Sequence, residues 1–163
     1  MGGYETEDLN STEFLFANKK SEQGPTLDFV IAHHCMVKVS ESAIYMVGGK
    51  QDGEISPQVW IADPTNNFEV KKGPSLQKGR YFHSCAVYQD SGAVKIVVAG
   101  GFGDAGPTNS VEILDPSKSN QWESGKNLVV CSLYLISTNH LIYKILLKLS
   151  LKLLYFFKLN ASR

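Results

Sequence analysis

The stretch Val97-Val98-Ala99-Gly100-Gly101, followed by Ser110-Val111-Glu112-Ile113-Leu114-Asp115-Pro116, decides the fold. It predicts an apolar strand that ends in two glycines, then a loop and a second strand closed by an Asp-Pro turn. Gly48-Gly49 and Asp63-Pro64 precede the glycine pair and the Asp-Pro of this stretch by the same 52 residues. The chain is therefore expected to consist of repeats of about 50 residues.

Each repeat is predicted to be an antiparallel meander of four short strands, because apolar runs alternate with clusters of Gly, Pro, Asn and Asp. The expected strands are His34 to Val39, Ala43 to Val47, Gln58 to Ala62 and Phe68 to Lys71 in one repeat, and His83 to Tyr88, Val94 to Ala99, Ser110 to Leu114 and Gln121 to Ser124 in the next. The paired glycines are expected to adopt positive φ and to allow a close backbone approach. Trp122 supplies a large apolar face for packing between repeats.

These residues resemble the kelch repeat, the four-stranded blade of kelch-type β-propellers. The features that carry the resemblance are an early His (His34 or His33 in one repeat, His83 in the next), the glycine pair, the Asp-Pro turn, the late aromatic residue and Arg80 three residues before His83. Trp60 departs from the pattern because it falls where the later repeat has Glu112. The earlier full repeat also lacks the Arg.

The resemblance covers residues 1–128 and implies an all-β, incomplete kelch-type propeller. We expect a partial blade at 1–27 and full blades at 28–76 and 77–128. Propellers close with about 4–8 blades, which at about 50 residues per repeat requires roughly 200–400 residues, whereas at most two and a half repeats are present here. The sequence is therefore interpreted as part of a larger propeller.

Residues 129–163 form a tail without repeat features, which we interpret as translated non-coding sequence or as a cationic amphipathic helix. Residues 1–125 hold all 16 Asp and Glu and 10 of the 16 Lys and Arg, whereas the remaining residues hold no acidic residue. Lys144, Lys148 and Lys152 recur every fourth residue among Leu and Ile, which suits a helix lying on a membrane surface. A membrane span is the least favoured reading, since three lysines oppose it.

Several kinds of chemistry are disfavoured. The repeat region is acidic, so no nucleic-acid partner is expected. His33 with Cys35 and His83 with Cys85 share strand faces, but the two pairs belong to different repeats and do not predict a metal site. We interpret these cysteines as small buried hydrophobic residues, because three cysteines are too few for a disulfide scaffold. The glycine-rich segment 100–106 lacks the ending of a phosphate-binding loop and is expected to be a flexible connection.

The resemblance implies a protein-interaction module that binds a protein or peptide partner, without catalysis or cofactor. Kelch propellers present the loops between the second and third strands and between blades at one end, where partners dock. The residues expected there are Arg80, Tyr81, Gln51, Asp52, Phe102 and Asp104, and the motif residues expected to hold the frame are Gly48, Gly49, Gly100, Gly101, Asp63, Pro64, Asp115, Pro116, Trp122 and His83. A structural role for Arg80 as a cap on its strand has equal weight.

Two alternatives remain open at this point. Galactose-oxidase-like copper enzymes also carry kelch-type blades, although no adjacent Tyr-His of their copper site occurs in this chain. The chain is alternatively a truncated product with no function of its own. The polar N-terminal residues predict no secretion signal, which slightly favours the cytoplasm and otherwise leaves the compartment open.

Overall fold

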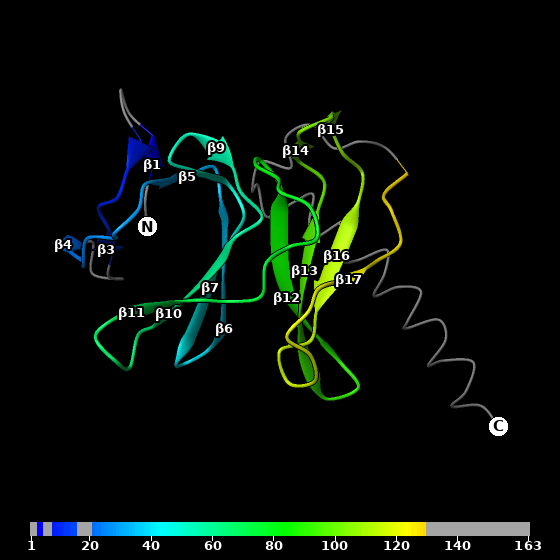
Figure 1. The fold of residues 1–163 in the computed structure, drawn as a ribbon. Helices are drawn as coiled ribbons and strands as arrows, with labels where there is room; N and C mark the ends of the chain where they lie inside the picture. The colour runs from blue at the N-terminus through cyan, green and yellow to red at the C-terminus, as the bar shows by residue number, and fades with distance from the viewer. Residues whose placement is uncertain (1–2, 5–7, 16–20, 130–163) are drawn as a thin grey trace.

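The computed structural model describes residues 3–4, 8–15 and 21–129, and all regular elements in these ranges are β-strands (Figure 1). Two four-stranded antiparallel sheets lie side by side and form its main part. The predicted all-β class with four-stranded blades is confirmed. Residues 130–163 lie outside the described ranges, and with them nearly all of the predicted tail. Within those ranges, no helix has the length and hydropathy needed to span a membrane.

The first of these sheets contains strands β6 (Cys35–Ser40), β7 (Ala43–Val47), β10 (Val59–Asp63) and β11 (Glu69–Lys72). Its strand order β11-β10-β7-β6 follows the chain, as expected for a meander. Exposure alternates along β6, whereas the last three residues of β7 are buried. The apolar run of β7 thus reflects a strand covered on both faces. We refer to this sheet as the first full blade.

The second sheet repeats the arrangement with β12 (Ser84–Asp90), β13 (Ala93–Ala99), β16 (Val111–Leu114) and β17 (Glu123–Ser124). The strand order is again that of the chain, β12-β13-β16-β17. Met46 pairs with Trp60 in the first full blade, and Val98 pairs with Glu112 in this one. Because Met46 and Val98 each lie two residues before a glycine pair, Trp60 and Glu112 are equivalent positions. This sheet is the second full blade.

Short additional strands lie at one end of both blades. The segment between β7 and β10 forms β8 (Lys50–Gln51) and β9 (Glu54–Ile55), which make a three-stranded sheet with β5 (Ile31–Ala32). The matching segment of the second blade forms a hairpin of β14 (Phe102–Gly103) and β15 (Gly106–Pro107). Residues 100–106 connect the second and third strands of the blade as expected, and part of this connection forms the hairpin. We call this end of the two blades, at the top of Figure 1, the loop end.

The N-terminal residues show two short hairpins, β1 (Gly3–Tyr4) with β2 (Asp8–Leu9) and β3 (Glu13–Leu15) with β4 (Ser21–Gln23). The backbone bonds that follow them recur later in the chain. The amide of Gly24 donates to the oxygen of Thr12, as Gly73 does to Val59 and Gly125 to Val111; Leu27 donates to Asn10, as Leu76 does to Pro57 and Leu128 to Asn109. This threefold recurrence supports a division of the chain near Leu27, Leu76 and Leu128, whose limits stay a prediction.

A hydrophobic core fills the space between the two full blades. The first blade and its exit contribute Tyr45, Val47, Val59 and Leu76; the second contributes Ile96, Val98, Leu114 and Trp122. Trp122 is 3% exposed, and its indole Nε1 donates to the backbone oxygen of Pro74 at 2.7 Å. Each blade thus covers an apolar face of its neighbour, as stacked repeats require. This packing holds the loop end of one blade against that of the other.

Candidate binding surface

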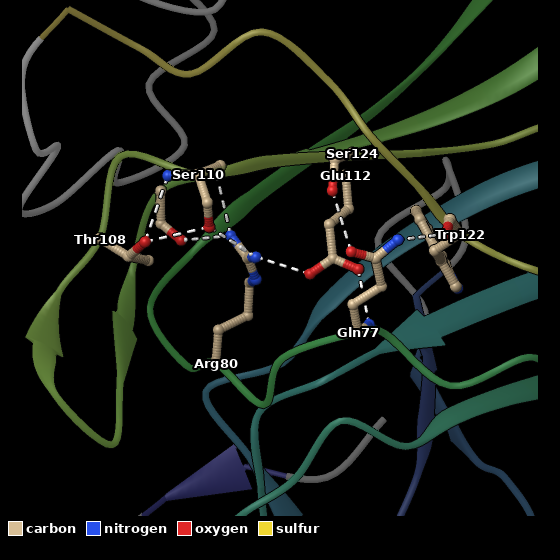
Figure 2. A network of polar contacts seen from close by, with 8 residues as sticks. Gln77, Arg80, Thr108, Ser110, Glu112, Trp122 and Ser124 are labelled. Carbon is tan, nitrogen blue, oxygen red and sulfur yellow. Dashed lines mark hydrogen bonds and ion pairs between the residues drawn. The ribbon is translucent and has the colours of Figure 1, made fainter.

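A buried polar network supports the loop end of the second blade (Figure 2). Arg80 is 1% exposed, and its guanidinium donates to the backbone oxygens of Gly100 (3.1 Å) and Ser110 (3.0 Å). It also donates to the Ser110 hydroxyl at 2.8 Å and to the Glu112 carboxylate at 2.7 Å. The other Glu112 oxygen accepts the amide of Gln77 at 2.7 Å. The charges of Arg80 and Glu112 are therefore paired and hydrogen-bonded inside the protein.

Burial gives Arg80 a structural role. Its side chain holds the segment before β12 against the glycine pair and against β16, which begins one residue after Ser110. With 1% exposure its guanidinium offers no surface to a partner. Of the two sequence-based readings of Arg80, the geometry favours the structural one. We accordingly leave Arg80 out of the docking surface proposed below.

The first full blade replaces this ion pair with apolar residues. Ala32 pairs with Lys50 as Tyr81 pairs with Phe102, so the preceding residues Ile31 and Arg80 are equivalent. Ile31 is 1% exposed, and Trp60 stands at the position of Glu112. The two departures from the repeat pattern thus belong together. Replacing both partners of a buried ion pair avoids leaving one unpaired charge inside the protein.

The structure also shows which histidine of the first full blade, His33 or His34, corresponds to His83. A Cβ placed on Gly49 would meet the Cβ of His34 at 2.8 Å, as one on Gly101 would meet the Cβ of His83 at 2.8 Å. His34, not His33, is therefore the counterpart of His83. Burial lowers the pKa of His34 to about 4 and that of His83 to about 3. Both imidazoles are neutral at pH 7 and pack as uncharged rings.

The glycine pair of the first full blade forms a joint with the second. Gly48 has φ of +57°, and a Cβ there would lie 2.8 Å from the backbone oxygen of Arg80 and 2.9 Å from Cε1 of His83. The amide of Gly49 donates to the same Arg80 oxygen at 2.8 Å. A side chain at Gly48 would separate the blades, so the pair serves contact between repeats as well as chain reversal.

The Asp-Pro turns stabilise themselves locally at the opposite end of the blades. The Asp63 carboxylate accepts the amide and the hydroxyl of Thr65, and the Asp115 carboxylate does the same with Ser117. These hydrogen bonds hold the pKa of both carboxyl groups below the usual range. The carboxylates are therefore occupied as turn acceptors.

A disulfide joins the two full blades. Cys35 in β6 and Cys85 in β12 are bonded, with their Cα atoms 5.9 Å apart. The interpretation of these cysteines as free buried hydrophobic residues is wrong. Equivalence of His34 with His83 places Cys35 opposite Ser84 and Met36 opposite Cys85, so the bonded cysteines are one position out of register. The sequence carried no signal for this pairing except the presence of both thiols near the start of neighbouring repeats.

Aromatic rings from both blades gather at the loop end. The ring centroids of Tyr81 and Phe102 lie 5.5 Å apart, and those of Tyr81 and Phe82 lie 5.1 Å apart. His33 of the first blade lies 4.2 Å from Phe82, and Nζ of Lys50 lies 5.0 Å from the centroid of the Tyr81 ring. All five side chains are partly exposed. We call His33, Lys50, Tyr81, Phe82 and Phe102 the aromatic cluster.

A shallow hollow of about 330 Å³ lies at the loop end of the first full blade, where its lining residue Gln51 follows Lys50 of the aromatic cluster. Trp60, Pro57 and Ile55 give it apolar walls, and Gln51, Asp52, Glu54 and Lys72 give it polar ones. The Trp60 ring stacks on Phe29 with centroids 4.1 Å apart, and its Nε1 donates to Gln51 Oε1 at 3.3 Å. Sequence reasoning treated Trp60 only as a departure from the repeat and did not predict this hollow.

The structure brings most of the residues expected at the docking surface to the loop end. Tyr81 and Phe102 are members of the aromatic cluster, and Gln51 lines the hollow. Asp52 is exposed with φ of +51°, and its carboxylate accepts the Val30 amide at 3.2 Å. Asp104 is exposed in the turn between β14 and β15. Phe82, His33 and Lys50 complete the cluster and were not among the residues predicted.

Across residues 3–4, 8–15 and 21–129, no three His, Cys, Asp or Glu side chains converge as metal ligands would. Cys35 and Cys85 are held in the disulfide. Both belong to the His and Cys pairs that share strand faces, so their sulfur atoms are not thiolate ligands in this structure.

The kelch motif matches residues 79–128, which begin one residue before Arg80 and end at the Leu128 that closes the second full blade. This segment contains the glycine pair, the Asp-Pro turn and the buried Trp122 described above. Residues 79–128 are a kelch repeat. None of the curated proteins matches the chain.

The first full blade has the same strand order as this kelch repeat, and Gly49 packs against His34 as Gly101 packs against His83. The chain thus contains one kelch repeat and, next to it, another blade of the same architecture, and the motif supports a fold of the protein-interaction kind.

Proposed function

We propose that this kelch chain binds an extended segment of another protein at the loop end and catalyses no reaction. The observation that carries the proposal is the aromatic cluster, in which Lys50 and Tyr81 come from neighbouring repeats and contact each other at 5.0 Å. A surface assembled from two repeats is suited to a partner that runs across both blades.

The side chains of the cluster suit recognition. Tyrosine and phenylalanine supply large, rigid contact areas with few rotatable bonds, and such residues dominate binding energy at interfaces. Tyr81 and Phe102 are only partly exposed, so burying their remaining surface requires little further ordering. Their rings are already held by neighbouring rings and by the antiparallel bridge between them.

The hollow next to the cluster extends this surface. Its mixed walls offer an apolar floor at Trp60 and hydrogen-bonding groups at Gln51 and Asp52. Partner side chains that pair an apolar stem with a polar tip match this chemistry. Asp104 lies in the exposed turn of the second blade, where it would meet a partner passing Phe102.

Selection from a displayed library of random peptides tests the proposal. The immobilised chain is expected to enrich peptides that bind it, and Tyr81→Ala or Phe102→Ala is expected to weaken that binding at least about tenfold, as for interface anchors. Glu41→Ala and Lys118→Ala, which alter exposed turns at the opposite end, serve as matched controls. Circular dichroism establishes that all variants are folded. Binding that survives both loop-end changes, or that depends on Glu41 or Lys118, would overturn the proposal.

A further inference from the structure

The disulfide links the two full blades covalently and so restrains their contact. Cys35 and Cys85 lie in β6 and β12, which belong to different sheets and form no strand pairing with each other. No strand hydrogen bonds hold β6 against β12. The covalent bond therefore fixes a contact between the blades that otherwise depends on side-chain packing. It closes a sequence separation of 50 residues, so its loss returns considerable freedom to the chain between the cysteines.

Other contacts between the blades lie close to this bond. The amide of Phe82 donates to the oxygen of His33 at 3.2 Å, and the amide of Gly49 donates to the oxygen of Arg80 at 2.8 Å. His33 precedes Cys35 by two residues, and Phe82 precedes Cys85 by three. The disulfide is thus only a few residues along the chain from these residues, whose backbone bonds cross from one blade to the other.

We propose that the Cys35–Cys85 disulfide is a reversible redox joint that holds the loop end in its binding geometry. A low-molecular-weight thiol of the glutathione class is the reductant. Two such thiols transfer two electrons and two protons to the disulfide, which yields two cysteine thiols and one disulfide of the reductant. The consequence for partner binding rests on the function proposed above, whereas the consequence for the blade contact does not.

The surroundings of the bond suit reversible exchange. Both cysteines are partly exposed, so a small thiolate can approach. The core between the blades is built from apolar side chains such as Trp122, Leu76 and Val47, and Cys85 packs against it. Reduction replaces the disulfide with thiols that still fill this place, so the core is expected to stay intact. The expected effect of reduction is therefore a looser loop end on blades that remain packed.

Hydrogen exchange of single amides tests the joint independently of any partner. In a Cys131→Ser background, a phosphine reductant is expected to speed exchange of the Phe82 and Gly49 amides at least about tenfold. The Gly73 amide, which donates to Val59 within one blade, is the matched control and is expected to change little. The Cys35→Ser, Cys85→Ser double variant is expected to exchange fast with or without reductant. Equal exchange before and after reduction would overturn the proposal.

Peptide mapping under non-reducing conditions and a binding assay complete the test. The oxidised protein is expected to yield one linked pair of peptides carrying Cys35 and Cys85, and free thiols at both positions would overturn the proposal. The peptide selected above is expected to bind the reduced protein at least about tenfold more weakly. If amide exchange responds to reduction but no peptide binds either form, the proposed function fails and the joint stands.

Discussion

Arg80 donates a 2.7 Å hydrogen bond to Glu112 although both side chains are almost fully buried, at 1% and 3% exposure (Figure 2). Desolvation of two charges opposes such a pair, and additional hydrogen bonds are needed to offset that cost. The oxygens of Gly100 and Ser110 and the amide of Gln77 supply such bonds, whereas Nε of Arg80 is buried without a hydrogen-bond partner in the described part of the chain. The pair therefore acts as a unit whose halves cannot be removed separately without a large loss.

Glu112→Leu is expected to destabilise the protein by about 3–5 kcal/mol, because it leaves the Arg80 guanidinium buried without its counter-charge. The Arg80→Ile, Glu112→Leu double variant is expected to recover most of that loss, since Ile31 already occupies the matching position of the first full blade. Urea denaturation measures both. Glu41→Ala, which breaks the exposed pair with Lys38, is the control and is expected to cost less than about 1 kcal/mol. A double variant less stable than Glu112→Leu would contradict the conclusion that Arg80 and Glu112 act as one unit.

Gly48→Ala is expected to cost more stability than Gly92→Ala, although both glycines have positive φ, of +57° and +83°. A side chain in the left-handed region costs about 1–2 kcal/mol at either position. At Gly48 the new Cβ would also overlap the Arg80 oxygen and the His83 ring, whereas nothing lies within 4 Å of a Cβ at Gly92. Thermal melting of the two variants compares them. Equal losses would show that the blades do not meet at Gly48.

Much of this architecture follows from local sequence signals. The glycine pairs and the Asp-Pro turns mark the ends of strands through their own conformational preferences. The strand positions and the four-stranded blades could therefore be predicted. β7 has the predicted limits Ala43 and Val47, and the other strands of the two full blades differ from prediction by at most two residues at either end. Such signals act within a few residues and need no tertiary contact.

The features that sequence reasoning missed depend on how one blade packs against the next. Pairing of Cys35 with Cys85 requires the offset between two sheets, which no local pattern encodes. Arginine suits both exposed interfaces and buried networks, so the burial of Arg80 follows only from its contacts with Gly100, Ser110 and Glu112. The hollow at Trp60 likewise forms where segments distant in sequence meet.

Stability is expected to fall as pH decreases from about 6.5, because His34 and His83 are buried in their neutral forms. Their pKa values, about 4 and about 3 in the folded protein, lie below the value of 6.5 expected when unfolded. Below pH 6.5 the unfolded chain therefore binds more protons, and the free energy of unfolding decreases until the folded pKa values are reached. Each histidine contributes at most about 1.4 kcal/mol per pH unit.

Urea denaturation between pH 7.5 and 5 measures this dependence apart from the carboxylates. The pKa values of Asp63, Asp90 and Asp115 lie below 3.8 in the folded protein, so these groups lose their stabilising effect mainly in more acidic solution. His83→Phe and His34→Phe are each expected to reduce the slope of the free energy of unfolding against pH in this window. The reduction expected is the contribution of one titrating histidine. A slope that neither change alters would refute the assignment of the two buried imidazoles as its source.

Trp122→Phe is expected to destabilise the protein by about 1–3 kcal/mol, because the backbone oxygen of Pro74 loses its donor inside the contact between the blades. Trp122→Ala also leaves a cavity among Leu76, Val47 and Ile96 and is expected to cost about 3–5 kcal/mol. The matched control is Trp60→Phe, since Trp60 is partly exposed at the hollow. Fluorescence-detected urea unfolding measures each variant through its remaining tryptophan, with circular dichroism as the second probe. If Trp122→Phe costs no more than Trp60→Phe, the indole bond to Pro74 does not hold the blades together.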